Sequence, residues 1–290
     1  TFAGLLAAFI ALFAWGVGDF FIQRTTRALT VARSLFFLGL VGALTLLPWA
    51  LPQLSRLWLN PQIGWLLLAT GAIALTVAPL NLMAFRRGKI AVVEPIMGLE
   101  LPLTVSLAMA VGGEQLMGWQ LALIIAVFCG IVLAAAAQAP RRGDLRALLE
   151  AGSLLALVGA FGSALGNFIL GTLSQLDSPL LGVWFSHAAL AVGCGLYLII
   201  RGEVHLLASD LRHHLGLILA QGALDTIAWV GYALAATALP IAVATTISQS
   251  YVAVAVLLGI AFNHERLRPH QWIGVSAAVA GVIALSAISG

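Results

Sequence analysis

The segments IAVVEPI (residues 90–96) and IAVATTI (residues 241–247) are two versions of one motif, 151 residues apart. The correspondence continues without a gap and pairs polar as well as apolar residues: Glu114 with Glu265, Gln120 with Gln271, and Gly130 with Gly281. Closer to the start, GDF at 18–20 aligns with GNF at 166–168 after a slip of three residues. Apolar composition would explain matches of Ala, Leu and Val, but not matched Glu and Gln. The sequence therefore predicts two homologous halves.

The composition places both halves in a lipid bilayer. Of the 290 residues, 61% are hydrophobic and 9% are charged, and the mean hydropathy is +1.05. Soluble domains have roughly 45–50% apolar and about 25% charged residues, so a water-soluble protein is excluded. Segments such as residues 121–137 are apolar on every face, which favours helices over the alternating strands of a membrane barrel. We predict an all-α integral membrane protein whose surroundings are lipid.

Glycine, proline and charged residues divide the chain into ten predicted transmembrane helices: 2–22, 29–49, 62–85, 90–111, 117–138, 148–173, 179–200, 214–237, 240–262 and 269–288. Two halves of five helices each are expected, and an odd number of helices forces the second half to insert upside down. We therefore predict two inverted five-helix repeats, residues 1–138 and 148–290, joined by a cytoplasmic linker at 139–147. The first residues lack a basic start and are interpreted as a retained span rather than a signal peptide.

The positive charges indicate the orientation in the membrane. Thirteen of the 14 Lys and Arg residues fall in the odd-numbered loops, and Arg56 is the exception. Because basic loops stay in the cytoplasm, both termini are predicted to be extracytoplasmic. The two halves carry opposite charge bias, as inverted repeats would. Although the pI is near 9.3, the basic residues are scattered in short loops, so no nucleic-acid partner is expected.

Each half carries the same short pattern around the junction of its fourth and fifth helices. In the first half a proline in the fourth helix is followed by a small residue, Glu, Gln and Gly: Pro102, Gly113, Glu114, Gln120 and Gly130. The second half keeps Glu265, Gln271 and Gly281, while Ala253 replaces the proline and His264 the small residue. On these residues each half resembles the EamA-type unit of the drug/metabolite transporter superfamily. Since Ala253 is not a proline, equal bending of the two fourth helices is not assured.

The resemblance implies an exporter of amino acids, other metabolites or drugs in a prokaryotic plasma membrane. It also implies that helices 1–4 and 6–9 surround a central cavity, with helices 5 and 10 outside. The YddG-like branch, which exports aromatic and other amino acids, is compatible with the sequence, although no motif selects it. The expected mechanism is alternating access around a midplane cavity. Import, another metabolite, a drug or a quaternary amine as substrate, and transport with or without proton coupling stay open.

Ionisable and aromatic residues inside spans are the candidates for the substrate pathway, because such side chains face a bundle interior or a wet cavity. Asp225, Trp229 and Tyr232 fall on one helix face, as do Trp184 and His187. The predicted cavity residues are Trp15, Asp19, Asn81, Glu100, Asn167, Trp184, His187, Asp225, Trp229, Tyr232, Gln249 and Tyr251. Faces that combine tryptophan with a carboxylate or imidazole suit an amphipathic or aromatic solute bearing an amine. The alternative is that these residues only form core contacts and structural hydrogen bonds.

Two prolines and two glutamates have predicted structural roles. Pro95 and Pro102 each remove a backbone hydrogen bond from the fourth helix and are expected to act as hinge or kink positions. Glu114 and Glu265 are expected to cap helices 5 and 10, which follow them, because a carboxylate suits a helix N-terminus. The polar stretch around Glu265 is therefore predicted to lie at the rim, away from the substrate site.

A membrane-embedded enzyme and a channel are the rival classes. An enzyme would need a nucleophile or metal constellation, but no HExxH, GxSxG, Cys/His ligand set or paired-Asp motif is present. Cys129 and Cys194 lie in apolar runs and match no metal or redox spacing. We therefore expect no enzyme activity, cofactor or metal. The inverted repeat does not exclude a channel. The expected partners are a small-molecule substrate and lipid, and the sequence is compatible with a monomer.

Overall fold

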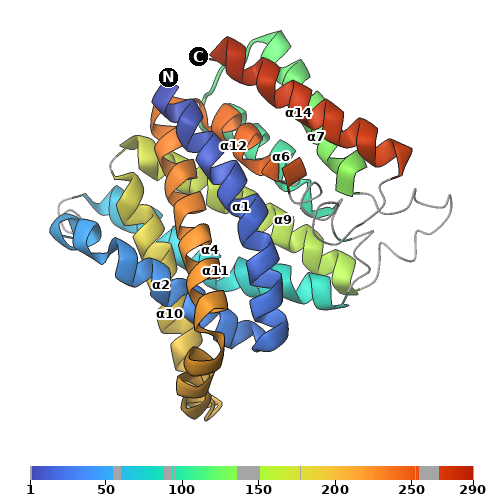
Figure 1. The fold of residues 1–290 in the computed structure, drawn as a ribbon. Helices are drawn as coiled ribbons and strands as arrows, with labels where there is room; N and C mark the ends of the chain where they lie inside the picture. The colour runs from blue at the N-terminus through green and yellow to red at the C-terminus, as the bar shows by residue number, and fades with distance from the viewer. Residues whose placement is uncertain are drawn as a thin grey trace.

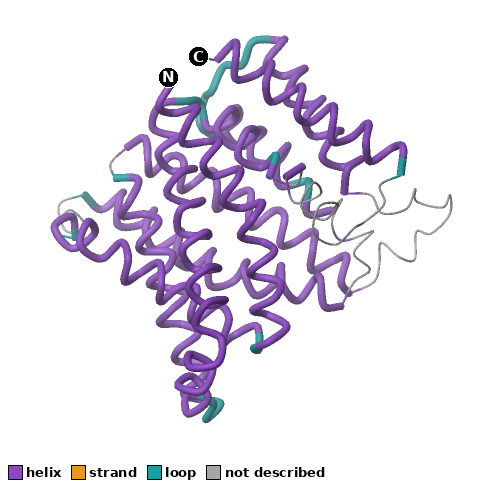
Figure 2. The backbone as a smooth tube through the Cα atoms, in the orientation of Figure 1, coloured by secondary structure: helices purple, strands orange, loops and turns teal. Residues whose placement is uncertain are grey.

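The computed structural model describes residues 2–54, 60–87, 93, 96–135, 151–176, 178–251, 253–254 and 268–289. These residues form α-helices with short connections (Figure 2). The elements are α1 (Phe2–Ala28), α2 (Val31–Ala50), η1 (Leu51–Gln53), α4 (Pro61–Arg87), α6 (Glu100–Ala110), α7 (Gly118–Ala135), α9 (Ala151–Leu176), α10 (Pro179–Ile200), α11 (Val204–Ala238), α12 (Ile241–Gln249) and α14 (Pro269–Ser289). Seven spans among the described residues are long and apolar enough to cross a membrane, and α6 and α7 are shorter apolar helices. The all-α prediction is confirmed.

The helix pairing follows a two-fold pattern. The five helices of the first half are α1, α2, α4, α6 and α7, and those of the second half are α9, α10, α11, α12 and α14. The first helix of each half packs along the third helix of the other, giving the pairs α1–α11 and α9–α4. The second helices pair with each other as α2–α10, and the fifth as α7–α14. Both termini lie at the same end of the bundle (Figure 1).

A row of glycines brings α9 close to α4. Gly159, Gly162 and Gly166 recur every three or four residues, so they lie on one face of α9. A Cβ atom at Gly162 would lie 2.5 Å from Val77, and one at Gly166 would lie 3.1 Å from Ile73. One at Gly159 would overlap Asn81 Oδ1. The glycine face therefore lets the two repeats approach at the level where Asn81 enters the interior.

Helices α7 and α14 form a separate pair on the flank of the bundle. Figure 1 shows them side by side and apart from the pair α1–α11, and their remaining contacts are chiefly with α6 and α12. Their backbones touch at Gly130 and Gly274, since a Cβ atom at Gly130 would lie 2.7 Å from Ala278 N. This is the outer position that the resemblance implies for helices 5 and 10.

The fourth helix of each half is interrupted at the same place. In the first half a turn at residues 98–99 precedes α6, and Pro102 lies in the first turn of α6. In the second half α12 ends at Gln249, and Ser250 forms a turn before helical residues resume at Tyr251. Leu99 and Ser250 are equivalent at the repeat offset of 151 residues. The break therefore recurs although Ala253 stands where the first half has Pro102.

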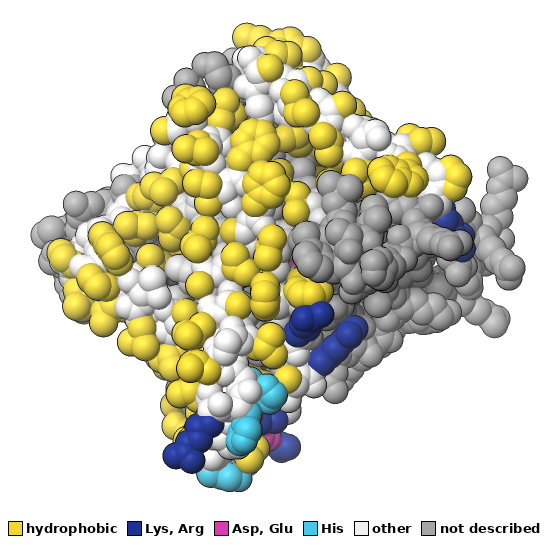
Figure 3. Space-filling model, in the orientation of Figure 1, with side chains coloured by type: hydrophobic (Ala, Val, Ile, Leu, Met, Phe, Trp, Pro, Cys, Tyr) yellow, Lys and Arg dark blue, Asp and Glu magenta, His cyan; other side chains and the backbone are white. Residues whose placement is uncertain are grey.

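The connection predicted at residues 201–213 is largely helical instead. Helix α11 begins at Val204 and continues across a bend at His214, where φ is −126° and ψ is 20°. Arg33 Nη1 of α2 donates to both carboxylate oxygens of Asp210, at 2.9 and 2.8 Å. This charge-assisted contact holds the polar first part of α11 against α2, which the apolar pattern could not predict. In Figure 3 basic side chains lie near the bottom and toward the right of the view, and hydrophobic side chains are spread over its upper and left parts.

Two Gly→Ala changes, one inside the α7–α14 contact and one outside it, are expected to have opposite effects on stability. Gly274→Ala places a methyl group against Ala134 N and 2.7 Å from Gly130 O, so we expect a loss of about 1–3 kcal/mol through overpacking. Gly216→Ala in α11 meets nothing within 4 Å and should gain up to about 1 kcal/mol in helix propensity. Thermal unfolding in one detergent compares the two variants. Equal shifts in Tm would contradict the close backbone contact.

The predicted orientation is testable by cysteine labelling in a Cys129→Ala background. In the predicted topology, Gln62 at the start of α4 lies on the same side of the membrane as the termini, and His205 at the start of α11 lies on the opposite side; both are exposed. A membrane-impermeant maleimide added to intact cells should label Gln62→Cys, while His205→Cys should react only after permeabilisation. The reverse pattern would place the termini in the cytoplasm.

Candidate functional site

The carboxyl group of Glu100, the first residue of α6, connects the two halves of the protein. Glu100 Oε1 accepts a hydrogen bond from Asn167 Nδ2 of α9 at 2.6 Å and another from Gln249 Nε2 of α12 at 2.8 Å. Glu100 belongs to the first half, and its two partners belong to the second. The contact forms where both fourth helices are interrupted. Interrupted helices that meet at a repeat interface are typical of substrate sites in secondary transporters.

Two further side chains extend this contact toward α4. Ser163 hydrogen-bonds to the Glu100 carboxyl group and accepts a hydrogen bond from Asn81 Nδ2 at 3.1 Å. The side-chain oxygens of Asn81 and Asn167 are buried and have no hydrogen-bond partner among the described residues. Leaving a buried acceptor unpaired costs about 1–3 kcal/mol, so each oxygen favours a donor. Asn81, Glu100, Ser163, Asn167 and Gln249 are called the polar centre below.

Four rings from three segments form an aromatic cluster beside the polar centre: Trp15, Trp229, Tyr232 and Tyr251. Trp15 of α1 meets Trp229 of α11 edge to face, with ring centroids 5.0 Å apart. The centroids of Tyr232 and Tyr251 lie 6.2 and 6.0 Å from that of Trp15. The Tyr232 hydroxyl donates to the backbone oxygen of Asn167 at 2.8 Å and lies 3.2 Å from Thr245 Oγ1. Tyr232 therefore joins the aromatic cluster to the polar centre.

His187 of α10 and Asp225 of α11 form a second polar contact, called the buried pair below. Their Nε2 and Oδ2 atoms are 3.1 Å apart, and the residues are 2% and 7% exposed. A Cβ atom at Gly42 of α2 would overlap the imidazole ring. Trp184, one turn earlier on α10, donates from Nε1 to Ala43 O at 3.0 Å. Both predicted residues of α10 therefore face α2.

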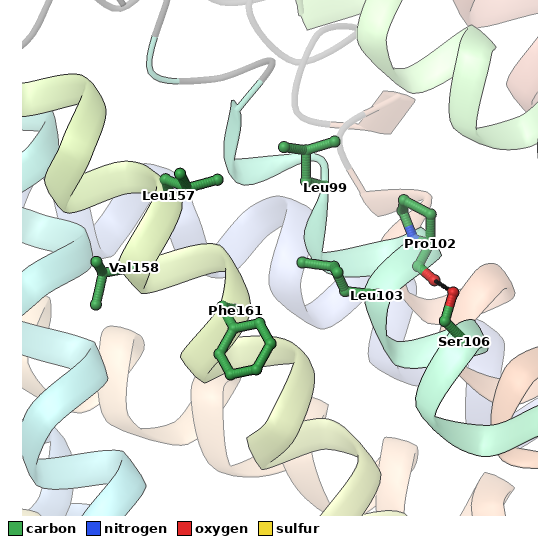
Figure 4. A pocket seen from close by; sticks show the side chains of 7 residues that line it. All are labelled: Leu99, Pro102, Leu103, Ser106, Leu157, Val158 and Phe161. Carbon is green, nitrogen blue, oxygen red and sulfur yellow. Dashed lines mark hydrogen bonds between the residues drawn. The ribbon is translucent and has the colours of Figure 1, made fainter. Parts of the chain in front are cut away.

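The remaining predicted positions fall outside these three groups. Asp19 lies one turn after Trp15 on α1 and is half-buried. Pro102 borders an apolar groove of about 520 Å³ between α6 and α9 (Figure 4). The groove is lined by Leu99, Pro102, Leu103, Ser106, Leu157, Val158 and Phe161. Leu157, Val158 and Phe161 are exposed, so this groove opens toward lipid. Pro95 lies outside the described residues.

The predicted role of Glu114 as a cap of helix 5 is wrong. Its carboxylate accepts hydrogen bonds from the backbone N–H groups of Ile241 and Ala242, the latter at 3.0 Å, so it caps α12 of the other half. The N-terminus of α7 is capped by Gln120, whose Oε1 accepts from Met117 N at 2.8 Å. The turn before α7 directs Glu114 across the repeat interface, which no local pattern predicts. Glu265 lies outside the described residues.

Gln271 repeats the role of Gln120 in the second half. Its Oε1 accepts from Arg268 N at 3.0 Å, at the start of α14. Its Nε2 donates to Ala134 O of α7 at 3.2 Å. The glutamine pair found by sequence alignment is therefore a pair of equivalent helix caps.

Sequence reasoning missed two members of the site, Ser163 and Thr245. Ser163 lies four residues before Asn167 on α9, and Thr245 lies four residues before Gln249 on α12. Residues four apart share a helix face, so this spacing was the available signal. No group of three or more His, Cys, Asp or Glu residues that could hold a metal occurs in the described part of the chain.

An inverted repeat of membrane helices with a polar contact between interrupted helices is typical of membrane transporters. The sequence profile of the EamA-like transporter family matches residues 2–136 and again residues 150–287. The chain therefore belongs to the EamA-like transporter family, within the drug/metabolite transporter superfamily, and it is a transporter and not an enzyme. No curated protein matches the sequence.

The fold is shared with solved structures. One, described only as "Crystal structure of protein", has a TM-score of 0.76 with this chain at 15% identity. The similarity covers 99% of this chain and 97% of the other. At this identity the likeness shows the fold alone.

The cap at α12 predicts a specific loss of stability in Glu114→Gln. An amide retains only one acceptor oxygen for the two N–H groups of Ile241 and Ala242 and removes the charge at the helix N-terminus. We expect a loss of about 0.5–2 kcal/mol in thermal unfolding. Glu203→Gln is the matched control, because Glu203 directly precedes α11 but its side chain makes no cap hydrogen bond there and lies 4.0 Å from Arg201. Equal Tm values for the two variants would contradict the cap.

Proposed function

We propose that this transporter exports small metabolites that carry a protonated amine beside an apolar or aromatic group, amino acids foremost, by alternating access across a prokaryotic plasma membrane. The observation that carries the proposal is the chemistry of the polar centre. A carboxyl group and the unpaired amide oxygen of Asn167 belong to one hydrogen-bonded contact, since Asn167 Nδ2 is 2.6 Å from Glu100 Oε1. Both groups accept hydrogen bonds, and an ammonium group supplies three donors.

The surroundings favour an aromatic or apolar substituent on the amine. The aromatic cluster lies next to the polar centre, because the Tyr232 hydroxyl donates to the backbone oxygen of Asn167. Aromatic rings pack against apolar and aromatic groups and also attract a cation over their faces. A solute with both features would contact the polar centre and the aromatic cluster together.

The polar centre also offers a way to couple substrate binding to the movement of the two halves. Glu100 contacts Gln249 across the interface between the repeats, at 2.8 Å. A substrate amine that replaced the Gln249 amide at Glu100 would separate α6 from α12. Binding and the relative movement of the two halves would then be coupled through one carboxyl group, as alternating access requires.

A quaternary amine is the less favoured alternative. It carries a positive charge but has no N–H group, so it would leave the Asn167 oxygen unpaired. An importer or a carrier of other drugs in the same superfamily would use the same fold. Export is preferred because the resemblance of the two EamA units implies it.

The test compares L-tryptophan with its Nα-trimethyl derivative, which keeps the positive charge and the indole ring but replaces the three N–H donors with methyl groups. We expect purified wild-type protein to bind L-tryptophan at least about tenfold more tightly, because a hydrogen bond to a charged group contributes about 1.5–3 kcal/mol. Glu100→Gln should weaken L-tryptophan binding and remove the preference. Binding is measured by the thermal shift of the purified protein and by counterflow in proteoliposomes.

Glu203→Gln is the charge-matched control and should bind as wild type, because Glu203 lies between α10 and α11, outside the polar centre and the aromatic cluster. Equal affinity of the wild type for the two tryptophan compounds would contradict the donor argument. Absence of binding by all primary amines in a screen of amino acids would reject the substrate class.

A further inference from the structure

The hydrogen bonds of His187 determine how many protons the buried pair holds. His187 Nδ1 lies 2.8 Å from the backbone oxygen of Val183. A carbonyl oxygen only accepts, so Nδ1 carries a proton and donates it. His187 Nε2 faces Asp225 Oδ2 at 3.1 Å. Without a further proton, a nitrogen lone pair would face a carboxylate lone pair, and the contact would be repulsive.

Burial leads to the same proton count. The pair lies between α10 and α11 with Gly42 of α2 against the ring, and the two residues are 2% and 7% exposed. A neutral imidazole beside a carboxylate would leave one uncompensated charge away from water, which is strongly unfavourable. One added proton makes the pair neutral overall. The pair is then either an imidazolium with a carboxylate or a neutral imidazole with a carboxylic acid.

We infer that His187 and Asp225 form a proton-binding site, separate from the polar centre, and that the proton is a second transported species. The site holds one exchangeable proton while Nε2 and Oδ2 are in contact. When movement of the helices separates the two groups or admits water, the proton passes to water and leaves an Nδ1-protonated neutral imidazole and a carboxylate. Rebinding in the other conformation takes a proton from the opposite side.

The position of the pair ties it to the interface between the repeats. The His187 ring packs against Gly42 of α2. About one turn earlier on α2, a Cβ atom at Gly39 would lie 2.7 Å from His187 O. The α2–α10 contact is one of the contacts between equivalent helices of the halves, as are α6–α12 and α7–α14. Asp225 is one turn before Trp229 of the aromatic cluster on α11. Any change of angle between the halves therefore acts on the imidazole, and any rearrangement of the cluster acts on the carboxylate.

The other titratable groups on the neighbouring helices are few. On α2 the charged residue is Arg33, which pairs with Asp210 of α11. On α1, Asp19 follows Gly18, whose Cβ position would lie 3.4 Å from Leu224. Helix α9 has no titratable side chain, α4 has Arg86 and Arg87 at its end, and α10 adds Cys194 and Tyr197. The remaining titratable residues of α11 are His205, Arg212, His213 and His214, at or before its bend, and Tyr232 of the aromatic cluster. Helix α1 also carries Arg24 and Arg27 near its end. Asp19 is therefore the group that an experiment must distinguish from the pair.

The Asp225→Asn variant removes the exchangeable proton but keeps the hydrogen bond to His187. An asparagine amide donates an N–H to a neutral Nε2, so the contact survives without the exchangeable proton. Gly42→Ala is the second variant: its methyl group displaces the ring from Asp225 without changing either titratable group. Asp19→Asn and Glu203→Gln are the controls.

The first measurement does not depend on substrate. Protein labelled with ¹⁵N-histidine and ¹³C-aspartate is studied by NMR in nanodiscs near neutral pH, and the signals are assigned by their loss in His187→Gln and Asp225→Asn. The expected wild-type result is a protonated Nδ1 with one more proton shared between Nε2 and Asp225. In Asp225→Asn the imidazole should be neutral. A neutral imidazole beside an ionised Asp225 in the wild type would overturn the inference.

The second measurement rests on the proposed function. Proteoliposomes containing a pH indicator are given L-tryptophan, and proton and tryptophan fluxes are recorded together. We expect about one proton per tryptophan for the wild type and Glu203→Gln, because the pair holds one exchangeable proton. In Asp19→Asn the rate of tryptophan transport can change, but the ratio of protons to tryptophan should stay the same. Asp225→Asn should still exchange tryptophan but move no protons, and Gly42→Ala should lose the fixed ratio.

The two measurements fail separately. Unchanged proton flux in Asp225→Asn, or a lower ratio of protons to tryptophan in Asp19→Asn, would overturn the second role of the pair while leaving the substrate proposal intact. If the wild type moves no tryptophan at all, the substrate proposal fails, and the NMR proton count still decides whether the pair binds a proton.

Discussion

The two hydrogen bonds to Glu100 Oε1 hold the halves of this protein together at the place where their fourth helices are interrupted. One comes from Asn167 of α9 and the other from Gln249 of α12, at 2.6 and 2.8 Å. An interrupted helix leaves backbone groups without partners, and lipid cannot supply them. The breaks are therefore tolerable only inside the bundle, and the polar residues beside them form the site proposed to bind a solute.

Side chains of each half also form hydrogen bonds with backbone groups of the other half near one end of this interface. Glu114 leaves the turn before α7 and caps α12, the helix that carries Thr245 and Gln249. Gln271 returns the contact by donating to the end of α7. Residues of the polar centre in one half are thus positioned by hydrogen bonds between side chains of the other half and its backbone. In an inverted repeat this arrangement lets a rearrangement at the interface reach both halves at once.

Much of the architecture followed from sequence, for identifiable reasons. The apolar runs and their breaks predicted the helices because a bilayer requires long apolar segments. The repeat offset predicted that Gln120 and Gln271 are equivalent, and both cap helices. The apolar pattern failed at residues 204–213, where a helix with Asp210 and Arg212 is held by the distant Arg33. It also failed for Glu114, because a carboxylate can cap a neighbouring helix as well as its own.

The sequence by itself determined the membrane environment, the number of spans, the two-fold repeat and the types of polar residue in the interior. These follow from hydropathy and from internal alignment, which need no knowledge of distance. The tertiary structure alone decided the grouping of the polar residues: Glu100 with Asn167 and Gln249, and His187 with Asp225. It did so because side chains separated by 38 to 149 residues meet only through helix packing. Glycines such as Gly42 and Gly159, whose Cβ positions are filled by partner side chains, set that packing.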